Sequence, residues 1–275
     1  MPVRVRHLSC GSFCPRPARL LAEAGGWTEP AHLVAHCLLI ESGGELVLVD
    51  TGLGTAQARS PHSIPLPTRL LIAPRPRMVD TAIGQIREVG LDPEDVRHVV
   101  VTHLDFDHAG GLADFPRAEV HVHETELQTA QSPPLNERLR YMQSQWAHGP
   151  RWAEHDVSGE SWFGFESVRL LEDLETEIAL VPLAGHSRGH CGVAVQDERG
   201  WLLHCGDAYF NAGEVQSPSH CPPGLRAFEA VLSSDNAARR ANVERLGELA
   251  RSHGDQVRLV CSHDKSELER ERSRQ

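Results

Sequence analysis

The chain has 275 residues, of which 40% are hydrophobic, and a formal net charge of −11. This composition excludes a fibrous or disordered chain, and the acidic balance argues against a nucleic-acid or anionic-membrane partner. The N-terminal stretch MPVRVRHLSCGSFCP lacks the apolar run of a signal peptide, and no later stretch approaches the roughly 20 apolar residues of a membrane helix. We therefore expect a soluble, cytoplasmic protein.

In the first half, residues 33–49 predict two short strands joined by a Ser-Gly-Gly turn, which places Asp50 at a strand end. A proline-rich segment, 54–78, is predicted to lie over the surface. Helical spacing over 79–90 ends at Gly90. The run VRHVVVTH, 96–103, is typical of a strand buried on both faces.

Residues 118–127 predict a strand that passes into a helix, and 129–165 predict an insertion that lines a substrate cleft. Strands follow at 167–174, 176–186 and 191–210, and then a second loop over 209–224. A helix capped by Asp235 or Asn236 and a last strand at 256–264 complete the pattern. Strands interleaved with helices in two similar halves favour layered α/β packing. The seven cysteines form no CxxC pair and are expected to be reduced packing residues: Cys10, Cys14, Cys37, Cys191, Cys205, Cys221 and Cys261.

Potential metal ligands follow four apolar, strand-like segments. They lie in HLDFDH (103–108), at His186 of LAGHSRGH, at Asp207 of HCGDAY and at His263 of CSHD. Imidazole nitrogens and carboxylate oxygens suit borderline and hard divalent ions, and strand ends bring such side chains together. A lone histidine after a strand is more often structural, and Asp107 could cap a helix. The joint occurrence favours a metal site.

The string THLDFDHAGG, preceded by LVDTG and followed by GHSRGH, GDA and SHD, resembles the metallo-β-lactamase superfamily, whose usual signature is HxHxDH. The match follows the superfamily's motif order over about residues 33–264. This resemblance implies one domain over residues 1–275, folded as a four-layer αββα sandwich with a dinuclear metal site at one edge.

By position, the resemblance implies that His103 and His186 bind the first ion. It implies that Asp107, His108 and His263 bind the second, and that Asp207 bridges both. Asp50 and His190 would support the ligands from behind. The ions are expected to be zinc. The water that they share would lose its proton at a pKa of about 7, and the hydroxide would attack a carbonyl while Asp107 orients it and later carries a proton to the leaving group.

Asp105 stands where the signature has its second histidine, so the motif here is HxDxDH. As a ligand it would lower the charge of the centre by one unit, raise the pH at which hydroxide forms, and favour manganese or iron. Two alternatives remain open. Asp105 does not bind metal and one ion sits on Asp107, His108 and His263, or His103, Asp105 and His186 form the face of a redox iron site.

The substrate is predicted to be a small molecule, most simply a lactone or related ester, because the chain ends soon after the last ligand, as in the lactonase branch. In that branch a tyrosine lies three residues after the bridging aspartate. Here Tyr209 lies two after it, which makes it a tentative helper for the carbonyl oxygen and puts a homoserine lactone in doubt. Thioester or β-lactam hydrolysis and metal binding without turnover remain alternatives, and a homodimer is possible. The aromatic side chains of the insertion either form an apolar wall of the cleft or pack in the local core: Tyr141, Trp146, Trp152 and Trp162. Arg138, Arg140 and Arg188 either meet a substrate carboxylate or lie in solvent as surface charges.

Overall fold

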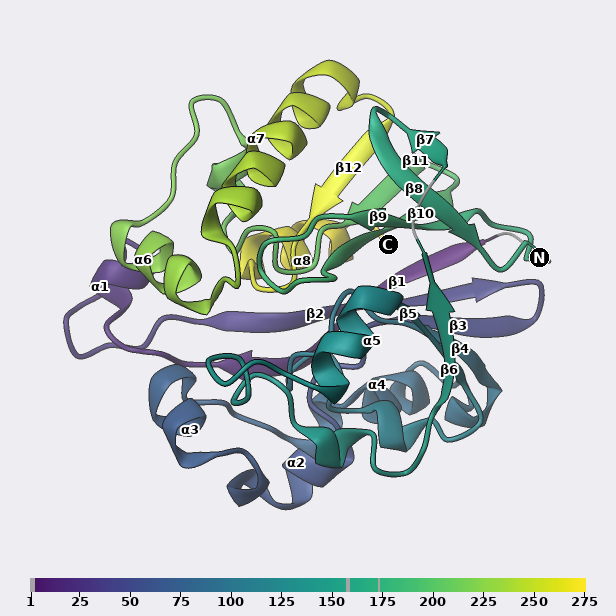
Figure 1. Ribbon diagram of the computed structural model, residues 1–275, viewed down its shortest axis with the longest axis horizontal. Helices are drawn as coiled ribbons and strands as arrows, with labels where there is room; N and C mark the ends of the chain where they lie inside the picture. The colour runs from purple at the N-terminus through teal and green to yellow at the C-terminus, as the bar shows by residue number, and fades with distance from the viewer. Residues whose placement is uncertain (1–2, 157–158, 173) are drawn as a thin grey trace.

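Two six-stranded sheets face each other, and helices cover their outer faces (Figure 1). The computed structural model describes residues 3–156, 159–172 and 174–275. The predicted four-layer αββα sandwich is confirmed. Residue 173 of one predicted strand and residues 157 and 158 of the predicted insertion lie outside the described residues.

The first sheet has the order β1-β2-β3-β4-β5-β6. Its strands are β1 Arg4–Phe13, β2 Leu33–Ser42, β3 Glu45–Val49, β4 Val96–Val100, β5 Glu119–His123 and β6 Arg151–His155. β1, β2 and β3 pair antiparallel, whereas β3 to β6 run parallel. The hairpin and the buried strand at 96–100 were predicted. β1 was not, and β6 lies within the segment predicted as an insertion.

The second sheet has the order β12-β11-β10-β9-β8-β7. Its strands are β7 Glu160–Trp162, β8 Phe165–Leu170, β9 Ile178–Pro182, β10 Cys191–Asp197, β11 Gly200–His204 and β12 Val257–Val260. All neighbours pair antiparallel except β11 and β12, which are parallel. Because β11 and β12 run in the same direction, the loops that follow them emerge at the same edge of the sandwich.

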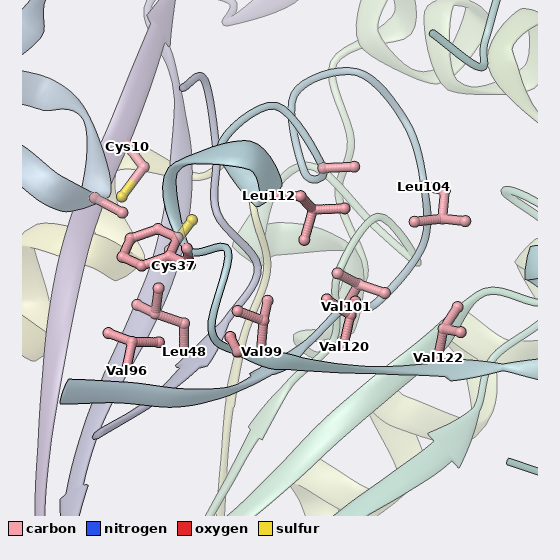
Figure 2. Close-up of a cluster of buried hydrophobic side chains, with 14 of the residues drawn as sticks. Cys10, Cys37, Leu48, Val96, Val99, Val101, Leu104, Leu112, Val120 and Val122 are labelled. Atoms are coloured by element: carbon pink, nitrogen blue, oxygen red, sulfur yellow. The ribbon is translucent and has the colours of Figure 1, made fainter. Parts of the chain in front are cut away.

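The continuous apolar runs of the strands fill two kinds of core, since side chains alternate between the faces of a sheet. Leu38, Ile40 and Val100 point into the layer between the sheets, where Val193 and Val260 of the second sheet meet them. The side chains of the opposite phase, with Val99 among them, pack under the helices, as Figure 2 shows. Truncating one such inner side chain to alanine typically costs about 2–5 kcal/mol.

The helices are α1 Ala18–Leu21, α2 Thr55–Arg59, α3 Leu66–Ile72, α4 Ala82–Glu88, α5 Glu124–Gln131, α6 Pro223–Leu232, α7 Asn236–His253 and α8 Lys265–Arg272. α4 and α5 cover the first sheet and α7 covers the second (Figure 1). Asp235 caps α7, as predicted, because its carboxylate accepts from two backbone N–H groups. Asp264 caps α8 in the same way. Among the described residues, no helix combines the length and apolarity needed to cross a bilayer.

The loops after β3, β4, β9, β11 and β12 meet at one edge of the sandwich. The backbone there is tightly packed: a Cβ on Gly110 would lie 2.5 Å from the carbonyl oxygen of Gly52. An isolated bridge joins Gly52 to Ala109, and the Thr51 N–H donates to the His108 carbonyl oxygen. Glycine at 110 thus lets the loop after β4 lie against the loop after β3.

Candidate metal centre

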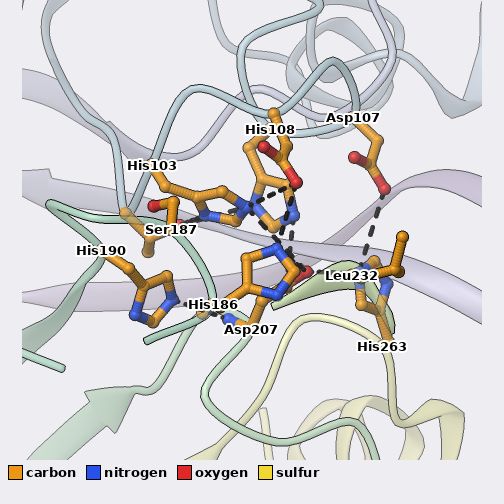
Figure 3. Close-up of polar contacts among 12 residues, drawn as sticks. His103, Asp107, His108, His186, Ser187, His190, Asp207, Leu232 and His263 are labelled. Carbon is orange, nitrogen blue, oxygen red and sulfur yellow. Dashed lines mark hydrogen bonds and ion pairs between the residues drawn. The ribbon is translucent and has the colours of Figure 1, made fainter. Parts of the chain in front are cut away.

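Six of the predicted ligands converge at this edge and are nearly buried (Figure 3). The loop after β4 carries three of them, and the loops after β9, β11 and β12 carry one each: His103, Asp107, His108, His186, Asp207 and His263. Their donor atoms form overlapping groups in which all atoms lie within 4.8 Å of one another. These groups are His103 with Asp105 and His186, His103 with His108 and Asp207, and Asp107 with His108 and His263.

Asp207 lies between the two sets of ligands that the sequence predicted. Its Oδ2 is 3.1 Å from His263 Nε2 and 3.4 Å from His186 Nε2. Its Oδ1 is 3.3 Å from His108 Nε2. Asp207 thus contacts histidines of both predicted sets, which agrees with the bridging role expected from the sequence.

The residues present fit divalent cations, because donor atoms at the centre of the cluster lack other partners. His103 Nε2, His108 Nε2 and Asp207 Oδ1 are buried and make no hydrogen bond within the described part of the chain; their neighbours are other atoms of the cluster, as in the 3.3 Å contact between His108 Nε2 and Asp207 Oδ1. Burying such atoms unpaired is costly, so a ligand that accepts their lone pairs would stabilise the site. The residues that would hold the ions are His103, Asp107, His108, His186, Asp207 and His263.

A second group of potential ligands has hydrogen-bond partners within the protein. It consists of His98, Glu119 and His121. His98 Nδ1 lies 3.0 Å from His121 Nε2, and His121 Nδ1 lies 3.0 Å from His155 Nε2. These rings hydrogen-bond to one another in a row across β4, β5 and β6. Their nitrogens are already paired, so this row has a structural explanation without metal.

Asp50 contacts the ring nitrogen of His108 that faces away from the cluster, which agrees with the supporting role expected from the sequence. Its Oδ2 lies 2.8 Å from His108 Nδ1, and its Oδ1 accepts from the Thr102 N–H at 2.8 Å. Burial opposes ionisation, but the charge and hydrogen bond of His108 hold the pKa of the Asp50 carboxyl below its usual value. A carboxylate on Nδ1 fixes the ring and leaves Nε2 free to face a metal. Asp50 takes a left-handed conformation, with φ of 56°, to reach this position.

His190 orients Asp207 through the backbone. Its Nδ1 donates to the Leu183 carbonyl oxygen at 3.0 Å, which leaves Nε2 to accept the Asp207 N–H at 2.9 Å. His263 is held similarly, because its Nδ1 donates to the Val34 carbonyl oxygen at 2.7 Å and its Nε2 faces the cluster.

Glu126 was missed by the sequence analysis, although it joins two ligand-bearing loops. Its Oε1 accepts the Leu104 N–H at 3.0 Å. Its Oε2 accepts from Ser187 Oγ at 2.7 Å and from the Gly189 N–H at 3.0 Å. Its one sequence signal is position: in α5 it lies four residues before buried Ala130, on the apolar face of the helix.

Asp105 is close to two of the predicted ligands and also has a cationic partner. Its Oδ2 lies 3.1 Å from His186 Nε2 and 3.5 Å from His103 Nε2. Arg140 Nη1 donates to both carboxylate oxygens, at 2.8 and 3.0 Å. Burial opposes ionisation, but Arg140 and His103 hold the pKa of the Asp105 carboxyl well below its usual value. The sequence analysis considered Arg140 only as a possible contact for a substrate carboxylate or as a surface charge.

A cavity of about 400 Å³ opens beside the cluster, and its polar side is formed by Asp105, Asp107, Asp207, His186 and His263. The other walls are largely apolar and come from β1, the loop after β4, α3 and α6. The residues on these walls include Phe13, Leu33, Leu71, Ile72, Phe106, Leu139, Phe210, Phe228, Val231 and Leu232.

Of the two alternatives for the tryptophan and tyrosine side chains, the structure supports packing in the core. Tyr141, Trp146, Trp152 and Trp162 do not line the cavity; they pack in the cores under the helices. Among the described residues of the segment 129–165, those that line the cavity are Asn136, Glu137, Leu139 and Arg140. Arg188 pairs with Glu137 at 2.9 Å instead of facing the cavity, and Arg138 lines a separate depression.

The structure also corrects the role suggested for Tyr209. Its side chain is fully buried in the core under α7, and its hydroxyl donates to Glu267 at 3.3 Å. The neighbouring Phe210 lines the cavity instead, with its ring 4.4 Å from the His263 ring. Consecutive side chains leave the backbone in different directions, so only one of the two reaches the cavity.

Comparison with known proteins agrees with this architecture. Residues 32–252 match the family model of the metallo-beta-lactamase superfamily. The chain therefore belongs to this superfamily, and it is a metallo-hydrolase of that fold. It is 42% identical over 264 residues to the probable metallo-hydrolase Rv2300c of Mycobacterium tuberculosis, an alignment that covers 96% of this chain and 81% of the relative.

Two solved structures show the same fold at low identity. A mutant of AiiA from B. thuringiensis, with N-decanoyl-L-homoserine bound at its active site, has a TM-score of 0.74 and 19% identity, with 98% of this chain and 97% of that chain covered. AidC, a dizinc quorum-quenching lactonase in complex with a homoserine product, has a TM-score of 0.62 and 14% identity, with 95% and 87% covered.

Proposed function

We propose that this chain hydrolyses a lactone, or a closely related ester, that carries an apolar substituent. The unpartnered donor atoms of His103, His108 and Asp207 beside a largely apolar cavity carry the proposal. The AidC and AiiA structures support it, since homoserine products occupy the sites of proteins with the same fold.

The proposed ligands are His103, Asp105 and His186 for one ion and Asp107, His108 and His263 for the other, with Asp207 between them. When bound, two divalent ions would supply Lewis acidity for the carbonyl and acidify a water molecule. The dizinc state of AidC supports zinc as the first choice.

Asp107 is the proposed catalytic carboxylate. It lines the cavity, and its Oδ2 is 3.9 Å from His263 Nε2. A carboxylate at the boundary between the ligands and the cavity is placed to orient the attacking water and then to deliver a proton to the leaving alcohol. Tyr209 has no part in this scheme because its hydroxyl is bound to Glu267.

The apolar walls support a substrate that carries a chain. Phe13, Phe106 and Phe210 surround the polar end of the cavity, whereas Leu71 and Val231 lie at its exposed rim. A hydrocarbon substituent would cover these side chains and lose contact with water. We therefore expect catalytic efficiency to rise with substituent length until the cavity is filled.

Metal analysis followed by a substrate screen tests the proposal. Purified protein would be stripped with a chelator, reloaded with zinc, manganese or iron, and assayed against lactones of increasing chain length, esters, thioesters and β-lactams. We expect lactone or ester turnover that disappears in the metal-free protein and in Asp107→Ala. Faster turnover of a thioester or β-lactam would show that the proposed substrate class is wrong. Metal binding with turnover no higher than that of Asp107→Ala would refute the proposed hydrolase activity.

A further inference from the structure

Asp105, which replaces the second histidine of the signature, is paired with Arg140, 35 residues away in the chain. We infer that Asp105 and Arg140 act as one unit, in which Arg140 positions the carboxylate and neutralises it, and that the pair takes the place of one neutral histidine. This inference rests on the metal site of the proposed function, but it concerns how that site is assembled rather than which substrate it uses.

The contacts of Arg140 show how the pair is held. Nη1 contacts both oxygens of Asp105, while Nη2 donates to the carbonyl oxygen of Leu232. Leu232 is the last residue of α6, where unpaired carbonyl groups favour a cation. The side chains of Asp105 and Arg140 are only 16% and 10% exposed, so solvent screens their attraction weakly. The guanidinium of Arg140 is therefore held through both of its terminal nitrogens.

The same contacts fix the direction of the carboxylate. Oδ2 of Asp105 is bound by Arg140 and still lies within 3.1 Å of His186 Nε2. Without the guanidinium, the Asp105 carboxylate would line the cavity together with two other carboxylates, Asp107 and Asp207, and would have no Arg or Lys partner among the described residues. Arg140 is thus a positioning residue that acts through Asp105.

Charge counting explains why the two residues belong together. Two divalent ions bring four positive charges, and Asp107 with Asp207 removes two. Asp105 would remove a third, but the buried Arg140 restores it, so the local charge equals that of a site with histidine at 105. The expectation that Asp105 makes the centre less positive is therefore replaced, because it counted the carboxylate without its partner.

Either single change should therefore disturb the site, and the double change should repair it. Asp105→His leaves the positive guanidinium unpaired beside the ions, which opposes cation binding, and Arg140→Met removes the contacts that fix the direction of the Asp105 carboxylate toward His186. The double variant Asp105→His/Arg140→Met removes both charges and restores the usual HxHxDH pattern. Loss of a residue that holds a ligand commonly lowers metal affinity about 10–100-fold.

The experiment measures zinc affinity by competition with a chromophoric chelator, together with metal content, in wild type, both single variants and the double variant. We expect each single variant to bind about tenfold more weakly or worse, and the double variant to recover to within a few-fold of wild type. Arg138→Met is the matched control, because it removes the same charge two residues away, at a side chain that lines a separate depression. It should leave zinc affinity unchanged.

Additive losses in the double variant, or a single variant with wild-type affinity, would overturn the inference. If Asp105→His fails to fold, Arg140→Lys decides: it keeps the charge, so it should retain most of the affinity that Arg140→Met loses, and equal losses in both would refute the charge argument. A rise in KM with unchanged zinc affinity in Arg140→Met would mark Arg140 as a substrate contact and also refute it. Because affinity is measured without substrate, a failed lactone screen leaves this result intact.

Discussion

Replacing Glu126 by alanine should weaken both the fold and the metal site, although this residue is not itself a proposed ligand. Its carboxylate is fully buried and accepts hydrogen bonds from two backbone N–H groups, those of Leu104 and Gly189, and from the hydroxyl of Ser187. Alanine offers no acceptor, and water has little access to this position.

The magnitude follows from the two backbone donors that would lose their partner. Each buried, unsatisfied N–H costs roughly 1–3 kcal/mol, so Glu126→Ala should lower the free energy of unfolding by about 2–6 kcal/mol. For a domain of this size, 1 kcal/mol corresponds to about 2–4 °C, so the expected fall in Tm is about 4–24 °C. Leu104 follows His103 directly, and Ser187 follows His186, so zinc affinity should also decrease.

Urea denaturation of the metal-free protein and chelator competition measure the two effects separately. Gln128→Ala is the control, because its side chain is exposed on the same helix, and its stability should stay within about 0.5 kcal/mol of wild type. If Glu126→Ala unfolds at the same urea concentration as the control, the loops are held by something other than this carboxylate and the reasoning is refuted.

Three further predictions concern single side chains. Asp50→Asn should lower zinc affinity about 10–100-fold in chelator competition, because the ring of His108 loses its anionic partner; unchanged affinity would contradict this. Tyr209→Phe should keep kcat within about twofold and lose about 1 kcal/mol of stability, whereas a large fall in kcat would restore its catalytic role. Burial raises the pKa of Glu229 to about 9, so the folded state holds this proton more tightly than the unfolded state, whose pKa is near 4.5. Stability relative to Glu229→Gln should therefore fall as pH rises from about 5 to 9, and parallel urea-denaturation profiles for the two proteins would show that the carboxyl is not buried in its neutral form.

Local sequence patterns were sufficient to predict elements whose stabilising contacts lie close together in the chain. The continuous β-branched run at 96–103 predicted a strand, which the structure has at Val96–Val100, and the two apolar runs of 33–49 form the predicted hairpin. The cap at Asp235 was likewise readable because a cap acts within three residues. β1 was missed because its residues, RVRHLSCGSF, alternate poorly, and its place depends on pairing with β2.

The direction in which a side chain points, and its partners elsewhere in the chain, could be determined only from the tertiary structure. Spacing alone did not show that Phe210 faces the cavity while Tyr209 faces the core. Nor did it show that α5 places Glu126 between two ligand loops. Both facts depend on how helices pack on the sheets, which involves contacts far apart in sequence.

The sequence by itself determined layered α/β packing and the residue types at the candidate centre, because apolar patterns and donor chemistry are local properties. The superfamily and its αββα sandwich followed from the resemblance of the motif strings, which are also local. Only the tertiary structure decided what surrounds those donors. Asp105 could be identified as a departure from the signature, but Arg140 became its partner only when residues 136–140 folded beside the loop after β4. The net charge of the site depends on every charged group that folding brings near it, so the spacing of residues within the motif does not predict that charge.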